Sequence, residues 1–190
     1  MKEVRCDDEG LALAAELLNK GGVAVIPTDT VYGLAAHPGF PAAVERLYTI
    51  KGREAKKPIA LLAADAAAAA RFLGGGLPPG ADELAVRHWP GALTLVLPVK
   101  DGSRFEGLRV PDHAWTRRLL AACGGVLRVT SANLSGCRPA TDAPAALADV
   151  GLSADIVVDD GISPGGVAST VVKVDATGER TVLRQGPVSV

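Results

Sequence analysis

The chain is poor in aromatic residues, in cysteine and in excess charge, and each scarcity excludes a class of protein. Aromatic residues make up 4% of the 190 positions, and the formal net charge is −1. A surface that binds nucleic acid in bulk needs a clear basic excess and aromatic rings for base stacking. The three cysteines are odd in number and lack metal-type spacing, so they predict no disulfide framework and fit a reducing compartment.

Signals for membranes, secretion and common catalytic folds are missing as well. No apolar run approaches the length that spans a bilayer, and the first eight residues contain no apolar signal-peptide core. We therefore expect a soluble cytoplasmic protein without membrane contact. There is no G-x-x-x-x-G-K-[ST] loop, no G-x-G-x-x-G after a strand, no G-x-S-x-G elbow and no H-E-x-x-H.

Histidine offers little chemistry in this sequence. The three histidines are scattered, and His113 beside Asp112 fits a helix start better than a catalytic base. We therefore predict no metal ion that is held by several protein ligands.

What is present is the composition of a globular domain. Hydrophobic residues make up 48% of the chain and charged residues 22%, which excludes a disordered chain. Helices are expected up to residue 20 after a cap at Asp7 or Asp8, at 41–50, 66–72 and 82–88, from a cap at Asp112 to residue 122, and at 144–150. Strands are expected at 23–26, 59–63, 93–99, 108–111, 126–129, 156–158, 169–174 and 181–184.

This order of elements predicts the fold class. Strands and helices alternate early and strands dominate late, which indicates an α/β fold with a twisted mixed β-sheet and flanking helices. No linker divides the chain, so we expect one domain over residues 1–190. In such sheets ligands bind in an open crevice at the strand ends.

The opening loop is the first candidate site. The strand at 23–26 stops at Pro27, and Thr28, Asp29, Thr30 and Tyr32 follow at once. These side chains either line a ligand site or form a turn that satisfies its own backbone. The segment alone leaves the two interpretations even.

A basic segment forms the second candidate. Lys51, Arg53, Lys56 and Lys57 lie within seven residues. Such a run is either a solvated loop or a grip on a polyphosphate, for which Arg supplies a planar fork and Lys a mobile charge.

The remaining polar candidates lie on or next to predicted strands. Arg109 sits between apolar neighbours and must face solvent or bind an anion such as a carboxylate. Ser131 and Asn133 alternate, so they face a phosphate or ribose together or form an Asx-type turn. Ser169 marks a strand start or a ligand contact, and Arg184 is a surface cation or part of the same crevice. One crevice rich in cations and hydroxyls would suit an anionic nucleotide and a small polar substrate.

Six motifs in a fixed order resemble one known family, the YrdC-like threonylcarbamoyl-AMP synthases, over residues 21–187. The motifs are PTDTVYGL at 27–34, KGR at 51–53, WPGALT at 89–94, LRVP at 108–111, SANLSG at 131–136 and ASTVV at 168–172. The resemblance implies a YrdC-like fold and an enzyme that joins L-threonine, bicarbonate and ATP into L-threonylcarbamoyladenylate and pyrophosphate. That reaction is the first step of the t6A modification at adenosine 37 of tRNA.

The resemblance also implies roles for individual residues. The nucleotide would be held by the K-x-R and S-x-N residues and by two further cations: Lys51, Arg53, Ser131, Asn133, Lys57 and Arg184. Threonine would be held by the first loop, the R-x-P arginine and the serine of S-T-V: Thr28, Thr30, Tyr32, Arg109 and Ser169. Lys51 and Arg53 would neutralise charge during catalysis, and residues 51–58 would close over the site.

Cofactors and partners follow from the same resemblance. Mg²⁺ would be held mainly by the ATP phosphates, which fits the lack of a carboxylate cluster. Threonylcarbamoyl transferase proteins that modify tRNA would act downstream, and a weak tRNA contact is conceivable. The sequence departs from many members at Glu54, where they have proline, and at Leu62, near which two-domain members place a histidine. By resemblance we expect the short, single-domain form of the family.

Two other functions remain as alternatives at this point. A related domain of hydrogenase-maturation carbamoyltransferases forms a carbamoyl adenylate, although it belongs to long multidomain chains. A binding module that holds RNA in a basic cleft is the other, against which the net charge and the scarcity of aromatics argue.

Overall fold

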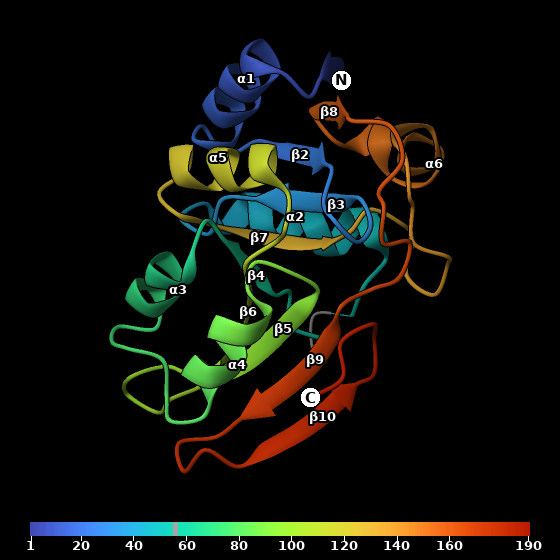
Figure 1. Ribbon diagram of the computed structural model, residues 1–190. Coiled ribbons are helices and arrows are strands. Elements are labelled where there is room, and N and C mark those ends of the chain that lie inside the picture. Colours follow the sequence, from blue (N-terminus) through green and yellow to red (C-terminus); the bar gives the residue numbers. More distant parts are fainter. Residues whose placement is uncertain (55–56) are drawn as a thin grey trace.

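The computed structural model describes residues 1–54 and 57–190, and one twisted mixed sheet runs through this part of the chain (Figure 1). The strand order is β1-β8-β2-β3-β7-β4-β6-β5-β9-β10. The strands are β1 (Lys2–Arg5), β2 (Val23–Ile26), β3 (Gly33–Ala36), β4 (Leu61–Ala63), β5 (Leu93–Pro98), β6 (Phe105–Arg109), β7 (Val126–Ser131), β8 (Ile156–Asp159), β9 (Thr170–Val174) and β10 (Arg180–Arg184). The helices are α1 (Asp8–Leu18), α2 (Pro41–Lys51), α3 (Ala66–Phe72), α4 (Ala81–His88), α5 (Ala114–Ala122), α6 (Ala143–Asp149) and the 3-10 turn Gly151–Ser153.

The predicted α/β class with a mixed sheet is confirmed, since the sheet contains both parallel and antiparallel pairs. β8 pairs in parallel with β1 and β2, whereas β3 pairs antiparallel with β2 and β7. In the second half, β4 is parallel to β6 and β5 is parallel to β9. The described helices are all too short or too polar to cross a membrane.

Local sequence explains where most helices begin and end. The side chains of Asp7, Asp65 and Asp142 accept hydrogen bonds from backbone N–H groups of α1, α3 and α6, which satisfies donors that have no partner within the helix. Helix α2 begins at Pro41 and stops at Gly52, whose φ of 57° is a left-handed cap that glycine adopts without steric cost. The expectation of Asp112 as the cap of α5 is wrong: His113 is the cap, and its ring accepts from the Thr116 N–H.

Five strands form a half of the sheet that helices cover on both faces, which we call the covered half: β1, β8, β2, β3 and β7. On one face Ala24, Ile26 and Leu127 pack with residues of α1 and α5. On the other face Val25 and Leu34 pack with α2 and α6. Figure 1 shows this layering, with α5 on one side of β3 and β7 and α2 on the other.

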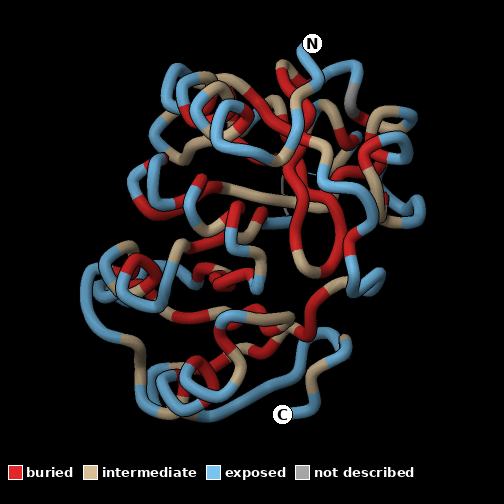
Figure 2. The backbone as a smooth tube through the Cα atoms, turned by 45° about the horizontal axis from the view of Figure 1, so that its top comes forward, coloured by how far each residue is buried: buried red, intermediate tan, exposed pale blue. Residues whose placement is uncertain are grey.

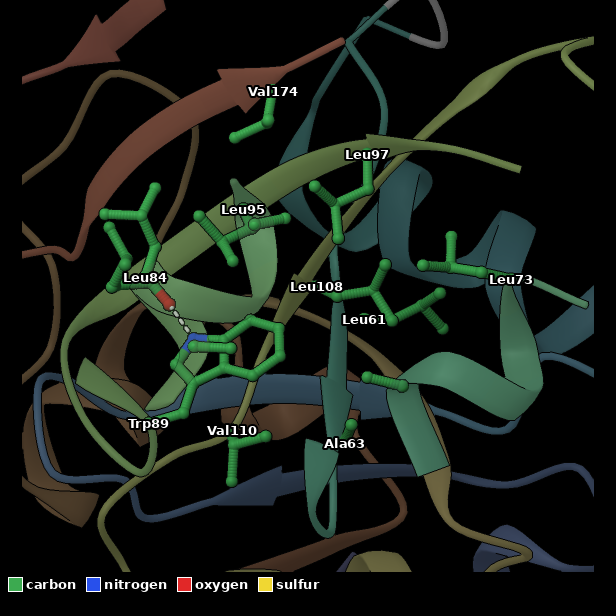
Figure 3. Packing of buried hydrophobic residues seen from close by; sticks show 14 of the residues in the cluster. Leu61, Ala63, Leu73, Leu84, Trp89, Leu95, Leu97, Leu108, Val110 and Val174 are labelled. Carbon is green, nitrogen blue, oxygen red and sulfur yellow. Dashed lines mark hydrogen bonds between the residues drawn. The ribbon is translucent and has the colours of Figure 1, made fainter. Parts of the chain in front are cut away.

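The other five strands form what we call the open half: β4, β6, β5, β9 and β10. One face carries a leucine-rich core that includes Leu61, Leu95 and Leu108 and packs against α3 and α4 (Figure 3). Trp89 closes this core, and its indole N–H donates to the Leu93 carbonyl at 2.7 Å. On the opposite face, which we call the cavity face, helix packing within the described residues stops at β4, where Leu62 packs with α5.

Burial follows the same division. Every residue of β2 and β3 is buried, whereas every residue of β10 is exposed. Figure 2 shows buried strands in the middle of the molecule and a long exposed stretch that leads to the C-terminus. The sheet is therefore fully buried at β2 and β3 and largely exposed at its two edge strands, β1 and β10.

An ion pair joins the two halves on the packed face of the sheet. Arg128 of β7 holds both oxygens of Glu106 of β6, at 2.6 and 2.9 Å, and donates to the Ile59 carbonyl. Burial raises the pKa of Glu106, but hydrogen bonds from Arg128 and Arg104 outweigh this and lower it. The Arg128 guanidinium also lies 5.8 Å from the centre of the Phe72 ring. The pair satisfies both charged groups without a ligand.

Candidate functional site

A cavity of about 480 Å³ lies on the cavity face, and most of the predicted site residues line it. Thr28, Thr30, Tyr32, Arg53, Arg109, Ser131, Ser169 and Arg184 belong to its wall. Lys51, Lys57 and Asn133 do not. The opening loop, the end of β7 and the end of β6 thus meet at one site, and the crevice extends from these strand ends across the sheet.

Strand alternation explains the composition of the cavity floor. Thr94 and Val96 of β5 line the cavity, while Leu95 and Leu97 between and after them belong to the leucine-rich core. The same holds in β6, where Gly107 and Arg109 face the cavity and Leu108 faces the core. Since side chains alternate along a strand, one sequence run builds both the core and the ligand wall.

Arg109 is the most constrained charge of the cavity. It is 6% exposed, and its guanidinium donates to three partners from two segments, Gly91 and the opening loop. Nε donates to the Gly91 carbonyl at 2.9 Å, Nη1 to Thr30 Oγ1 at 2.8 Å, and Nη2 forms an ion pair with Asp29. Burial lowers the pKa of Arg109, and Asp29 opposes that shift. The sequence left solvent or an anion as the partner of Arg109, and the structure supplies the anion from the opening loop.

The opening loop is both a turn that satisfies its own backbone and part of the cavity wall. The sequence alone did not decide between these two interpretations. Thr28 braces the turn itself, because its Oγ1 donates to the Val31 carbonyl at 2.6 Å and accepts from the Thr30 and Val31 N–H groups. Thr28 and Thr30 both line the cavity, and Thr30 Oγ1 accepts a hydrogen bond from Arg109. Gly165 packs so tightly on the loop that a Cβ there would lie 2.6 Å from the Asp29 carbonyl oxygen. The loop is a rigid, self-satisfied turn that presents its hydroxyls to the cavity.

A second hydroxyl cluster faces the loop across the cavity. Ser169 Oγ lies 2.8 Å from Thr94 Oγ1, and both side chains are buried. Arg184 donates from Nη2 to the Ser169 carbonyl at 2.7 Å and to Ser169 Oγ at 3.2 Å. Burial lowers the pKa of Arg184. This cluster places one guanidinium beside two hydroxyls at the β9–β10 side of the cavity.

The basic segment divides into parts that reach the cavity and parts that do not. Arg53 lines the cavity, and its guanidinium donates to the carbonyls of Lys57 and Pro58 at 3.0 and 3.2 Å. Lys57 is exposed and pairs with Glu54 at 3.4 Å. Lys56 and part of the expected closing segment at 51–58 lie outside the described residues. Among the described cations of this segment, Arg53 is the one that lines the cavity.

Lys51 occupies a different position from the one expected of a phosphate ligand. It is 3% exposed, and its Nζ donates to the carbonyls of Ser131 and Asn133, both at 2.5 Å. Burial, and next the charge of Arg53, lower the pKa of Lys51 to about 8. In this structure Lys51 joins the end of α2 to the end of β7 and thereby fixes the Ser131 backbone at the cavity.

Asn133 and Tyr32 also use their polar atoms within the fold. The Asn133 side chain donates to the carbonyls of Leu134 and Cys137, both at 2.8 Å, which closes the turn at 133–137 from the donor side. The Tyr32 hydroxyl donates to the Gly161 carbonyl at 2.8 Å and accepts from the Asp160 N–H at 3.0 Å. Burial raises the pKa of Tyr32 to about 12. Tyr32 lines the cavity, but its hydroxyl is engaged by the chain.

The donor set of the wall suits anionic and hydroxylated ligands. Arginines from the opening, middle and late parts of the chain contribute three guanidinium groups to the wall, namely Arg53, Arg109 and Arg184. Among the described lining residues none is an aspartate or glutamate. A magnesium ion that arrives on nucleotide phosphates fits such a wall, because Mg²⁺ keeps waters and phosphate oxygens as its main ligands.

The sequence did not predict two contacts at the site. It placed Asp29 in the opening loop but did not pair it with Arg109, and it gave no role to Thr94, which pairs with Ser169. Thr94 had a signal in the alternation of β5, because it lies on the polar side of a strand whose other face is leucine-rich. Asp29 had no signal for this partner, since 80 positions separate it from Arg109.

Comparison with known proteins gives a consistent family. The family model Sua5/YciO/YrdC, described as telomere recombination, matches residues 16–186. The threonylcarbamoyl-AMP synthase of Bacillus subtilis is 35% identical over 196 residues, which span 98% of this chain and 56% of that protein. A putative threonylcarbamoyl-AMP synthase of Mycobacterium leprae is 36% identical over 189 residues, which span 95% of this chain and 84% of that protein.

A solved structure agrees with the sequence relatives. The crystal structure of Pyrococcus abyssi Sua5 complexed with L-threonine superposes with a TM-score of 0.86 at 31% identity, and covers 97% of this chain and 57% of that one. This chain thus spans a little over half the length of the Bacillus and Pyrococcus proteins.

Proposed function

The chain belongs to the Sua5/YciO/YrdC family, and from that membership we propose that it joins L-threonine, bicarbonate and ATP into L-threonylcarbamoyladenylate and pyrophosphate. The observation that carries the proposal is the cavity on the uncovered sheet face, whose wall combines buried hydroxyls with three guanidinium groups. A site of this kind suits a small hydroxylated amino acid beside a polyphosphate.

Threonine is assigned to the Arg109 side of the cavity. The guanidinium is held by Gly91, Thr30 and Asp29, so it is already oriented before a substrate carboxylate arrives. Two of its five N–H groups have no partner among the described residues, and a fork of that kind matches a carboxylate. The hydroxyls of Thr30 and Ser169 would face the threonine hydroxyl and amine.

The nucleotide is assigned to the side of Arg53, Ser131 and Arg184. Arg53 and Arg184 would neutralise phosphate oxygens, and Ser131 would donate its hydroxyl to a phosphate or ribose. Lys51 would act through the Ser131 backbone that it holds, and Asn133 through the turn that it closes. Bound Mg²⁺, carried by the phosphates, would supply further charge neutralisation.

The chemistry needs alignment more than an acid or base. The threonine amine and bicarbonate form a carbamate with loss of water. A carbamate oxygen attacks the α-phosphorus, the bond from that phosphorus to the bridging oxygen breaks, and pyrophosphate leaves. The chain holds both substrates in line and stabilises the charge that builds on the phosphates. An enclosed site also protects the carbamate from water.

The decisive assay measures pyrophosphate release with ATP, Mg²⁺ and bicarbonate, with and without L-threonine. The proposal expects release that depends on threonine and a product that carries both the threonine and the AMP. Release that is the same without threonine, or no release with all substrates, would contradict it.

Two additional arms separate the alternatives. If carbamoyl phosphate supports turnover in place of threonine and bicarbonate, the chain forms a carbamoyl adenylate instead. If tRNA binds with a steep salt dependence and no threonine-dependent turnover follows, the cavity serves an RNA-binding module. In the proposed role the chain acts in the cytoplasm and passes its product to threonylcarbamoyl transferase proteins that modify tRNA, with at most a weak tRNA contact of its own.

A further inference from the structure

Three potential metal ligands from distant parts of the chain converge on one side of the covered half. Cys6 follows β1, Asp160 follows β8, and His113 caps α5. Their ligand atoms all lie within 4.8 Å of one another, and His113 Nε2 is 2.9 Å from Asp160 Oδ2. We propose that Cys6, His113 and Asp160 form a binding site for a borderline-soft divalent cation, with Zn²⁺ as the best fit.

The backbone holds the three residues in place independently of any ion. The Cys6 N–H donates to the Asp159 carbonyl at 2.9 Å, which continues the parallel pairing of β1 and β8. The Asp160 N–H donates to the Tyr32 hydroxyl at 3.0 Å. Helix α5 fixes the backbone of His113. A preorganised set of ligands loses little entropy when an ion binds.

The proton inventory of His113 leaves one ring nitrogen for a cation. Thr116 Oγ1 donates its single proton to the Pro27 carbonyl at 2.7 Å. In the metal-free ring Nδ1 accepts from the Thr116 N–H at 3.2 Å, so the ring proton is on Nε2 and is donated to Asp160 at 2.9 Å. When a cation binds Nε2, the ring proton moves to Nδ1, where Thr116 Oγ1 at 2.9 Å accepts it in place of the cap bond. The cation then replaces the proton between Nε2 and the carboxylate, and the Nδ1–H bond is the usual second contact of a metal-bound histidine.

Local charge favours a cation at the same place. Three acidic residues, Asp7, Asp159 and Asp160, surround the Cys6 thiol, and their negative charge attracts a cation. When Zn²⁺ binds, the Cys6 proton leaves to solvent and the thiolate ligates the metal, which removes one positive charge from the site.

The ligand types identify the class of metal. A thiolate and an imidazole select Zn²⁺ over Mg²⁺ or Ca²⁺, and a carboxylate is a common third ligand. Cys6 and His113 are partly buried and Asp160 is exposed, so a water can complete a tetrahedron. None of the three lines the cavity, but Thr116 links the site to Pro27 at the base of the opening loop. The ion would tie β1, β8 and α5 together beneath that loop.

The test is a titration of the metal-free protein with Co²⁺, which reports its ligands by absorption. We expect binding of one Co²⁺ per chain, a thiolate-to-cobalt charge-transfer band in the near ultraviolet, tetrahedral visible bands, and displacement by Zn²⁺. Cys6→Ser and His113→Gln should each weaken Co²⁺ binding at least about 10-fold, and Cys6→Ser should abolish the charge-transfer band.

Matched controls exclude other thiols and imidazoles. Cys137→Ser removes an exposed thiol and His37→Gln an imidazole at a distant surface, and both should bind Co²⁺ like the parent chain. Circular dichroism confirms that each variant is folded, and Asp160→Asn supplies an independent third variant. A parent spectrum without the thiolate band, or a band that survives in Cys6→Ser, overturns the site. This readout does not use enzymatic turnover, so it fails or succeeds independently of the proposed function.

Discussion

In both halves of the sheet, side chains alternate between two faces along each strand, but the two halves use these faces differently. In the covered half both faces of β2 and β3 are buried by helices, and α1, α5, α2 and α6 account for the cover. In the open half one face is a core under α3 and α4, and the opposite face is the wall of the cavity. The site thus exists because the described helices on the α1–α5 face cover only half of the sheet.

Two arginines of the sheet, Arg128 half-buried and Arg109 buried, show the same difference at the level of single residues. Arg128 on the packed face is matched by both oxygens of Glu106. Arg109 on the cavity face divides its donors among a carbonyl, a hydroxyl and one carboxylate oxygen. The first arrangement is complete in itself, while the second keeps donor capacity for a ligand. The predictions below test this difference between the packed face and the cavity face, starting with the largest expected effect.

The largest effect is expected at Arg109. Arg109→Lys keeps a charge but loses the fork, and loss of one partner in a buried, hydrogen-bonded charge network costs about 2–5 kcal/mol. The kcat/KM for threonine should fall about 100-fold or more, mainly through KM, in the pyrophosphate assay. Arg128→Lys is the matched control, and should lower the thermal stability with little change in KM for threonine. Equal effects of the two variants on KM would break the comparison.

The next effect separates the two faces of one strand. Leu95→Ala empties the leucine-rich core and should reduce the free energy of unfolding by about 2–5 kcal/mol. Val96→Ala, on the adjacent cavity-facing position, should cost about 1 kcal/mol or less because its side chain already borders open space. Urea denaturation measures both. Similar losses would mean that the cavity face is packed in solution.

Asp29 should matter through the orientation of Arg109. Asp29→Asn removes a charge-assisted bond, worth about 1.5–3 kcal/mol for a buried partner, and should raise KM for threonine about 10-fold with a smaller change in kcat. Asp8→Asn breaks the exposed pair with Arg118 and serves as the control, since such pairs contribute little. An unchanged KM for threonine in Asp29→Asn would show that Asp29 does not orient Arg109 for threonine binding.

The pH dependence of the free energy of unfolding tests whether the Lys51 amine is buried between α2 and β7. Its folded pKa of about 8 lies below the ordinary lysine value, so between pH 8 and about 10 the unfolded chain binds more protons. The free energy of unfolding should therefore rise with pH there, by about 1 kcal/mol per unit at most, relative to Lys51→Met. The neutral amine keeps two donors for its two carbonyl partners. The control, Lys20→Met at an exposed lysine, should show no such relative rise, and a flat difference for Lys51→Met would place its amine in solvent.

The smallest effect is expected at Lys57. Its side chain is 62% exposed in a pair with Glu54 and does not line the cavity. Lys57→Ala should change KM for ATP less than about 2-fold, because exposed ion pairs contribute about 0–1 kcal/mol, whereas Arg53→Ala should raise KM for ATP clearly. An equal rise in both variants would show that Lys57 reaches the nucleotide in the substrate complex.

Most elements were predictable because their signals are local. The helices at 41–50 and 66–72 were expected within one residue, since Pro41 and Asp65 mark their starts. Strand β3 was missed because its sequence, GLAA, lacks the β-branched residues that indicate strands. Strand β1 was missed because KEVR is short and polar, and parallel pairing with β8 over 150 positions away stabilises it.

The site was predictable in its residues but less so in their partners. Eight of the predicted residues line one cavity, because the motifs lie at loops and strand ends. The interactions of Lys51, Asn133 and Tyr32 with backbone atoms were not predictable, since backbone partners leave no trace in the sequence. The Cys6–His113–Asp160 cluster was missed for a related reason: the three residues have no metal-type spacing.

A crystal structure of the chain with ATP and L-threonine would show whether the uncovered face of the open half is the substrate site. We expect threonine to lie against Arg109 and Thr30, and the phosphates to lie near Arg53 and Arg184 above Val96. Ligand density on the packed faces under α1 to α6, or outside the cavity, would contradict it.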